Sequence, residues 1–229
     1  MANVNNPPTS LPEILPVFPL TGVLVFPGMI LPLHIFEPRY RNLIEDALSA
    51  DAVFGMIQPL VPRQDNRPLA GEDQEAPELY RIGCAGYIEK WEKLGDGRYV
   101  LELRGMNRFR AQGELSLHRG YRRVNADYGE FGDYPIDRSW RCDRARLTKA
   151  LEDYARTHGL ALDLSAADQL WDLEFVSILG MSLPFHPAEK QALLEAPTCQ
   201  DRESVLINLL SLGSGRLNPD ESVPPRTVH

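Results

Sequence analysis

The residues that most often carry chemistry in proteins are histidines, cysteines and paired carboxylates, and here they form no recognisable site. His34 lies within an apolar run, where a structural histidine with its hydrogen bonds satisfied is a more typical interpretation than a catalytic base. His186 precedes Pro187 and Glu189, a pattern typical of a helix start rather than a metal-ligand pair. His158 falls at an expected helix C-terminus, where a positive charge is stabilised by about 0.3–1 kcal/mol. The carboxylates are scattered over polar positions, so the sequence nominates no general acid and base.

Motifs for nucleotide binding and hydrolysis are absent from the sequence. No Gly-Lys dipeptide occurs, which excludes a P-loop. Gly95 and Gly97 begin a dinucleotide-like pattern, but Val100 occupies its last glycine position. No GxSxG, HExxH or CxxC segment occurs, and Ser214 lies in a Gly-Ser-Gly stretch near the end. We therefore expect no catalytic residue, no metal site and no cofactor.

One cluster of positive charge suggests a functional surface, because its sign is opposite to that of the whole chain. The formal net charge is -8, with a sequence pI near 5.2. Between residues 104 and 123, six arginines face a single acid, Glu114, for a local balance of +5. The cluster could meet phosphates or an acidic partner, or it could pair with Glu89, Glu92, Glu102 or an acidic loop over 59–78. Pairing within the protein is the commoner outcome. The cluster consists of Arg104, Arg108, Arg110, Arg119, Arg122 and Arg123.

Composition bounds the class of protein. The chain has 229 residues, 43% of them hydrophobic and 24% charged, which is typical of a globular protein. The negative charge disfavours nucleic acid and anionic membranes as partners. Cys84, Cys142 and Cys199 are odd in number and far apart, which favours reduced thiols. No secretory signal and no membrane-length apolar run is present, so we expect a cytoplasmic protein.

Hydrophobic patterning predicts strands over roughly the first 130 residues. Prolines within Leu15–Leu20 and Met29–Phe36 favour edge strands and the corners of a small closed sheet. Pro38 opens a predicted helix with Leu43 and Leu48 at helical spacing. Gly95-Asp96-Gly97 predicts a long hairpin. About six strands are expected in a mostly antiparallel barrel: Leu15–Leu20, Met29–Phe36, Val53–Gln58, Arg81–Leu94, Arg98–Ala111 and Tyr121–Tyr128.

After Pro135 the period changes to that of helices. A first helix is expected to end near Gly159, and Ser165 is the expected cap of a second. A third helix begins at Pro187, and Thr198 caps a fourth. These helices are expected to form a small bundle.

Two long stretches resemble a known family. The segments 15–49 and 82–111 contain PVFPL, FPGM, PLHIFEPRYR, DGRY and GMNRFR in order. They are similar to the amino-terminal substrate-binding domain of Lon protease. Leu183–Pro184 and Lys190–Glu195 resemble the bundle that follows the barrel in that domain. The resemblance covers about 13–212.

The resemblance implies an α+β fold, a PUA-like mostly antiparallel β-barrel followed by a helical bundle. The expected organisation is a flexible tail over 1–12, the barrel over 13–130, the bundle over 131–212 and a second flexible tail over 213–229. In Lon protease an ATPase and a Ser-Lys protease would follow the bundle, and this sequence contains neither segment. We therefore expect a stand-alone member of the family that is not an enzyme.

The expected function is non-catalytic binding of unfolded or tagged polypeptides, or of a protein partner, as a substrate-recognition or adaptor module related to proteolysis. The expected site is an apolar groove at the junction of barrel and bundle, with hydrogen bonds from a strand edge to an extended peptide. The candidate contacts are Met29, Phe36, Tyr40 and Trp91, because methionine and aromatic side chains give large, adaptable contacts. Core packing is the competing role for each. The main alternative is RNA binding through Arg104, Arg108, Arg110, Arg122 and Arg123. A second alternative is an enzyme that acts on a small molecule in the cleft between barrel and bundle, although the sequence nominates no catalytic residues for it. A monomer or dimer is expected.

Overall fold

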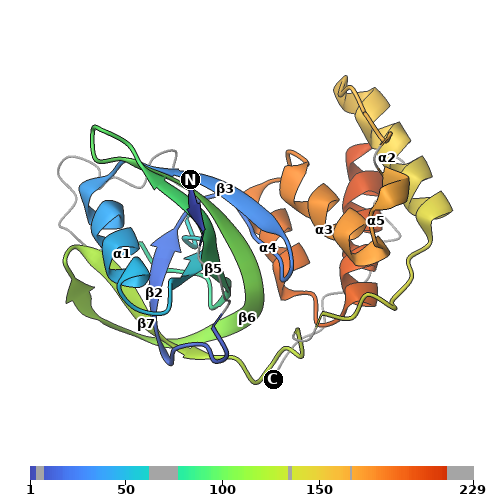
Figure 1. Cartoon of the computed structure of the whole chain (residues 1–229). Coiled ribbons are helices and arrows are strands. Elements are labelled where there is room, and N and C mark those ends of the chain that lie inside the picture. The colour runs from blue at the N-terminus through green and yellow to red at the C-terminus, as the bar shows by residue number, and fades with distance from the viewer. Residues whose placement is uncertain (4–7, 62–76, 134–135, 166, 216–229) are drawn as a thin grey trace.

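The chain forms a strand-rich body and a group of helices that lie side by side (Figure 1). The structure is a computed structural model that describes residues 1–3, 8–61, 77–133, 136–165 and 167–215. The first body contains β1 (Ala2–Asn3), β2 (Ile14–Pro19), β3 (Ile30–Ile35), α1 (Pro38–Leu48), β4 (Val53–Ile57), β5 (Ile82–Lys93), β6 (Tyr99–His118) and β7 (Tyr121–Asp127). The second contains α2 (Arg144–His158), a 3-10 turn (Ala167–Gln169), α3 (Asp172–Ser182), α4 (Pro187–Glu195) and α5 (Cys199–Gly213).

The strands make one mixed sheet that closes on itself. Their order is β1-β5-β4-β2-β7-β6-β3, and β5 also pairs with β6, so that β5, β4, β2, β7 and β6 form a ring. The strands β2 and β4 run parallel, and the other recorded pairs are antiparallel. The expected α+β fold, a mostly antiparallel barrel followed by helices, is confirmed.

The strand β2 corrects one sequence expectation, because it is not an edge strand. It pairs with β7 through Val17 and with β4 from Val17 onward. Pro16 lies where the partner is β7, and Pro19 lies where the partner is β4. At each proline, β2 therefore has a recorded partner strand on one side only. A proline is tolerated there because the side of the strand without a partner needs no N–H donor. The prediction holds for β3, whose recorded partner among the described strands is β6.

Local signals in the first half placed the hairpin and α1 correctly. The amide of Leu94 donates to the Arg98 carbonyl, and Gly97 has the positive φ of 82° that its turn requires. Pro38 begins α1, whose Tyr40, Leu43 and Ile44 are buried. The structure adds a short strand within the segment expected as a tail, since Ala2 pairs with Trp91.

Helix caps explain where the later helices begin. Gly159 ends α2 with a left-handed φ of 64°, and the Thr198 side chain accepts from the Asp201 amide at the start of α5. The expected cap at Ser165 is wrong, because α3 begins at Asp172. The Ser165 amide instead donates to Asp163 at 3.0 Å, and the Trp171 amide donates to Glu174 at 3.1 Å.

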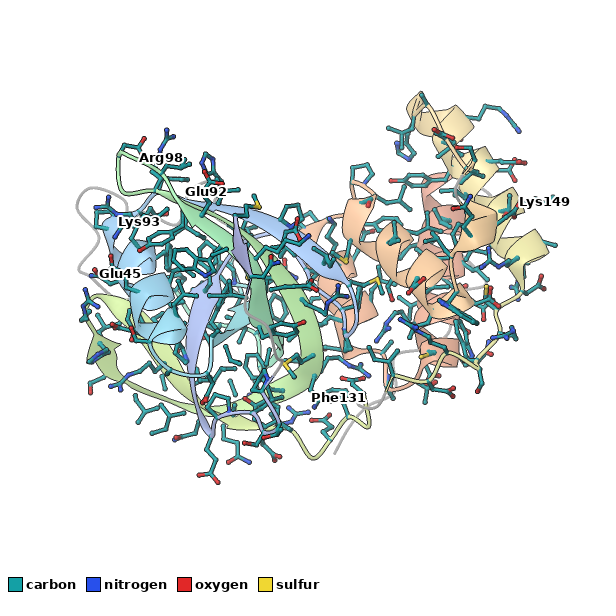
Figure 2. The ribbon with its side chains drawn as sticks, viewed as in Figure 1. Glu45, Glu92, Lys93, Arg98, Phe131 and Lys149 are labelled. Atoms are coloured by element: carbon teal, nitrogen blue, oxygen red, sulfur yellow. The ribbon has the colours of Figure 1, made fainter. Side chains whose placement is uncertain are left out.

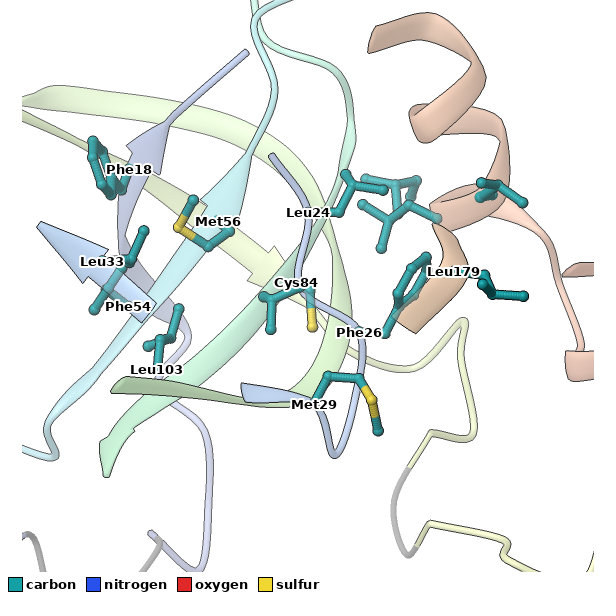
Figure 3. Packing of buried hydrophobic residues seen from close by; sticks show 14 of the residues in the cluster. Phe18, Leu24, Phe26, Met29, Leu33, Phe54, Met56, Cys84, Leu103 and Leu179 are labelled. Carbon is teal, nitrogen blue, oxygen red and sulfur yellow. The ribbon is translucent and has the colours of Figure 1, made fainter. Parts of the chain in front are cut away.

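A single apolar cluster joins the two bodies. Leu24, Val25 and Phe26, in the loop between β2 and β3, are at most 3% exposed. They belong to the same cluster as Leu179 and Leu193 of the helices. Figure 3 shows Leu24 and Phe26 beside the helix that carries Leu179. The helices are therefore packed against the barrel through a shared core.

Two sequence expectations fall largely outside the described residues. Residues 62–76 of the expected acidic loop are not described, and neither are residues 216–229 of the expected second tail. The three cysteines are free thiols. Among the described residues, no helix is long and apolar enough to cross a membrane.

Candidate functional site

A cavity of about 680 Å³ lies where the barrel meets the helices. Its size is within the range of about 300–1,000 Å³ that is common for ligand pockets. The barrel contributes Gly22, Val23, Leu24, Gly28, Met29, Ile30, Leu31, Pro32 and Arg104, and the helical body contributes Leu170, Glu174, Ile178, Met181, Ser182 and Lys190. We call this space the junction cavity.

The strand β3 forms the barrel wall of the junction cavity. Ile30 and Pro32 are exposed, whereas Leu33 and Ile35 point into the core, which is the alternation of a half-buried strand. Pro32 has no N–H and pairs opposite Glu102 of β6. Figure 1 shows β3 along the side of the barrel that faces α4. The wall is therefore an apolar edge strand, which is the type of element that an extended peptide can join.

A close backbone approach positions the start of β3. Gly28 has a φ of 83°, and its amide donates to the Gly105 carbonyl at 2.8 Å. The Gly105 amide in turn donates to the Met29 carbonyl at 2.9 Å. A Cβ at Gly105 would lie 2.2 Å from the Phe26 carbonyl oxygen, so this approach requires glycine.

One face of α3 and Leu170, two residues before the helix begins, form the opposite wall. Leu170, Glu174, Ile178 and Met181 follow one another at intervals of four, four and three residues, which places them on one side of the helix. Ile178 is 38% exposed although it is a large apolar side chain. The two walls therefore present apolar side chains to the same space.

Buried amides hold α4 against the barrel beside the cavity. The Gln58 side-chain amide donates to the Pro187 carbonyl and to Gln191 Oε1, both at 3.0 Å. Gln191 donates to the Ile82 carbonyl at 3.0 Å, and Gln58 Oε1 accepts from the Gly22 amide at 2.7 Å. Both glutamines are at most 2% exposed. Because buried amides need their partners, this network fixes the position of α4.

A buried arginine fastens the other end of α4. Arg108 of β6 forms an ion pair of 2.8 Å with Asp133. It also donates to the carbonyls of Leu194 and Ala196, which belong to the end of α4 and the residue after it. Its guanidinium stacks on the ring of Phe131 at 3.9 Å. A charge expected on the surface thus joins the barrel to the helices.

Lys190 brings a positive charge to the junction cavity. The side chain extends from α4, is 7% exposed, and donates from Nζ to the Met181 carbonyl at 2.8 Å. Burial lowers its pKa from the usual value. Among the described residues, no carboxylate lies within salt-bridge distance of Nζ.

The structure separates the four residues expected to contact polypeptide. Met29 lines the junction cavity and is 7% exposed. Tyr40 is 5% exposed and its ring centroid lies 4.3 Å from that of Phe18, in the core. Trp91 is half-buried beside Tyr99, with 6.1 Å between ring centroids. Phe36, directly after β3, is 58% exposed and is not among the residues that line the cavity.

Sequence reasoning did not identify the helical wall. A signal was available in α3, whose sequence DLEFVSILGMS is apolar on nearly every side. A surface helix normally has one apolar stripe, so a helix of this kind is expected to have a second apolar contact. Ile178 and Met181 occupy that second face.

The arginine cluster is divided among internal partners. Arg104 pairs with Glu89, which is one of the partners considered from the sequence. Arg123 donates to the Ser116 carbonyl at 3.1 Å. The remaining pairs are Arg108 with Asp133, Arg110 with Glu130, Arg119 with Glu45 and Asp46, and Arg122 with Glu114. The described part of the chain contains no group of three or more His, Cys, Asp or Glu that could hold a metal ion.

Comparison with known sequences decides the family. The profile of the ATP-dependent protease La (LON) substrate-binding domain matches residues 14–211, which is most of the chain. The chain belongs to this family. Lon protease 2 of Myxococcus xanthus is 33% identical over 117 residues, which are 51% of this chain and 13% of that protein. Lon protease 2 of Syntrophobacter fumaroxidans is 23% identical over 82% of this chain and 23% of that protein. The chain therefore spans less than a quarter of the length of these Lon proteases.

Solved structures of the Lon family share the fold. A Lon N-terminal domain protein from Xanthomonas campestris matches with a TM-score of 0.57 and 25% identity, over 86% of this chain and 97% of that one. The N-terminal domain of a Mycobacterium avium complex Lon protease matches with a TM-score of 0.55 and 19% identity, over 87% of this chain and 98% of that one. The barrel and the helical body together thus correspond to a Lon N-terminal domain.

Proposed function

We propose that this Lon-family domain is a non-catalytic module that binds extended apolar polypeptide segments in the junction cavity. The observation that carries the proposal is the pairing of two apolar walls, the edge strand β3 and the exposed face of α3, around one space. An extended segment could lie along β3 and place alternate side chains against α3. The family, whose name describes substrate binding, supports this class of ligand.

The exposed apolar residues on the two walls support the proposal. Ile30 of β3 is 41% exposed and Ile178 of α3 is 38% exposed. Both line the junction cavity, and binding would remove their remaining exposed surface from water. The gain comes from apolar burial and depends little on salt.

RNA binding is not favoured by the arrangement of the arginines. Arg104, Arg110 and Arg122 pair with Glu89, Glu130 and Glu114. Each of these guanidinium groups would have to leave a carboxylate before it could bind a phosphate. RNA binding therefore predicts a steep fall in affinity with salt, whereas the proposed polypeptide binding does not.

Fluorescence anisotropy with an unfolded polypeptide tests the proposal. The probe is a fluorescein-labelled protein held unfolded by reduction and alkylation of its cysteines, titrated at about 50 and about 200 mM salt. We expect saturable binding that changes little with salt. The variants Ile30→Ser and Ile178→Ser should each weaken binding about fivefold, since completing the burial of one isoleucine contributes about 1 kcal/mol.

A matched surface variant controls for general effects on the protein. Leu162→Ser removes an apolar side chain that is 37% exposed and does not line the cavity, so it should bind as the unaltered protein does. The double variant Ile30→Ser with Ile178→Ser should weaken binding about 25-fold if one segment contacts both walls. Unchanged binding in the double variant, with saturable binding in the unaltered protein, would contradict this location of the site.

A further inference from the structure

Lys190 adds a positive charge to a junction cavity that is otherwise lined mostly by apolar residues. Its ammonium group has three N–H donors, and the recorded protein partner is the Met181 carbonyl at 2.8 Å. Lys190 is 7% exposed, so little of the residue is in contact with bulk water, and the remaining donors are available to a group bound in the junction cavity. A buried charge without an ionic partner is costly, and an anion bound beside it would remove that cost.

The other charged groups of the cavity already have partners. Arg104 donates to Glu89 and, at 3.0 Å, to the Gly28 carbonyl. Glu174 accepts from the Trp171 amide at 3.1 Å and lies 3.8 Å from Arg138. Lys190 is therefore the one charge lining the described cavity that has no partner of opposite sign.

We propose that Lys190 binds the terminal carboxylate of a polypeptide whose last residues are apolar. The junction cavity would thus recognise exposed apolar C-termini, with the two apolar walls holding the side chains and Lys190 holding the chain end. This inference rests on the proposed function, because it assigns a chemical class to the polypeptide that occupies the same cavity.

The depth of Lys190 favours a chain end over an acidic side chain. Of the residues that line the cavity, Ile30 and Ile178 are 41% and 38% exposed, whereas Lys190 is 7% exposed. A carboxylate that reaches Lys190 must therefore enter a less exposed part of the cavity than the part lined by Ile30 and Ile178. A chain end enters once, but a segment in mid-chain must enter and leave, and its additional backbone N–H and C=O groups would need buried partners. A terminal carboxylate also supplies two acceptor oxygens for the remaining N–H groups.

Three labelled peptides separate the sources of the carboxylate. They share one apolar sequence ending in leucine, with fluorescein at the N-terminus. The first is the free acid, the second is the C-terminal carboxamide, and the third is a carboxamide with glutamate in place of the penultimate residue. In anisotropy titrations the free acid should bind at least about tenfold more tightly than either carboxamide, because a hydrogen bond to a charged group is strong when buried.

A pair of lysine variants assigns the preference to its residue. Lys190→Met keeps the apolar stem and removes the charge, so the free acid should fall to the affinity of the carboxamide while the carboxamide itself is unchanged. Lys149→Met is the matched control, because it removes the same charge from α2. Figure 2 shows Lys149 on the side of the helices that lies away from the barrel. This control should keep the full preference for the free acid.

The titrations distinguish failure of the inference about Lys190 from failure of the proposed function. Equal binding of free acid and carboxamide to the unaltered protein overturns the inference, even if Lys190→Met fails to fold. A preference that persists in folded Lys190→Met also overturns it, and so does a glutamate carboxamide that binds as tightly as the free acid. If the unfolded polypeptide binds but the free acid binds no more tightly than the carboxamide, the proposed function is supported and the inference about Lys190 is contradicted. If neither the unfolded polypeptide nor any peptide binds, both proposals fail.

Discussion

The variant Arg108→Met tests whether a buried ion pair joins the barrel to the helices. The Arg108 side chain is 3% exposed and that of Asp133 is 10% exposed. The guanidinium also donates to the carbonyls of Leu194 and Ala196 at 2.9 and 2.5 Å. Methionine fills a similar apolar volume but offers none of these bonds. The variant keeps the backbone amide of residue 108, which donates to Asp133 at 2.9 Å, but it removes the guanidinium that neutralises this carboxylate and bonds to the Leu194 and Ala196 carbonyls.

The expected loss follows from the burial of this pair. Removing one member of a buried, hydrogen-bonded ion pair typically costs about 3–5 kcal/mol, because the remaining charge is uncompensated. For a protein of this size that loss lowers the melting temperature by about 6–20 °C. Adding Asp133→Asn to Arg108→Met should recover part of the loss, since the second substitution removes the stranded charge.

Arg110→Met is the matched control on the same strand. Arg110 pairs with Glu130 at 2.6 Å, but these side chains are 38% and 39% exposed. An exposed pair of this kind contributes about 0–1 kcal/mol. Urea unfolding followed by circular dichroism measures the free energy of unfolding of both variants.

Two results of these unfolding experiments would contradict the role given to Arg108. If Arg108→Met and Arg110→Met lose the same free energy of unfolding, within about 0.5 kcal/mol, burial of the Arg108 pair does not matter and the docking role of Arg108 is refuted. A double variant with Asp133→Asn that is less stable than Arg108→Met alone would also contradict the account, because it would show that no stranded charge had been relieved.

Two further predictions concern the helical body and the loop beside the cavity. Burial raises the pKa of Asp172, but bonds from Arg144 and the Cys142 amide outweigh burial and hold that pKa below its usual 3.8. The stability that Asp172 contributes is therefore present above pH 3.8 and is lost as the pH falls through the lowered pKa. In urea unfolding, the deficit of Asp172→Asn relative to the unaltered protein should shrink over that interval, and a constant deficit would contradict the shift. Gly105→Ala should lose about 1–3 kcal/mol through its contact with the Phe26 backbone. Gly113→Ala, with open space around its Cβ, should lose much less, and equal losses in thermal melts would contradict the close approach.

Features that depend on neighbouring residues were predicted well from the sequence. The hairpin at Gly97, the helix after Pro38 and the cap at Thr198 each depend on a few consecutive residues. The start of α3 was misplaced, because Ser165 has cap chemistry but its amide bonds to Asp163 instead. Local preference yields where another partner competes for the same backbone group.

Features that depend on distant residues could not be predicted in this way. The residues around Arg108 in the sequence are typical of a surface charge. In the structure its partners are Asp133 and carbonyls at the end of α4, and one of these carbonyls, that of Leu194, is 86 residues further along the chain. The junction cavity likewise needs Ile30 and Ile178 to meet across the fold. The apolar sequence of α3 contains a signal for a second apolar contact, but only the packed structure identifies the strand that faces it.

The contacts that dock α4 also determine the shape of the candidate site. Gln58 bonds both to Gly22, which lines the junction cavity, and to Gln191, which adjoins Lys190 on α4. The same apolar cluster continues through Met29 on one wall and Leu179 of α3 on the other side. Core packing and buried amides therefore fix the position of both walls before a ligand binds. Binding then loses little conformational entropy of the protein. A cavity of this kind can select its ligand by shape and by one fixed charge, which is why the proposals place their tests on Ile30, Ile178 and Lys190.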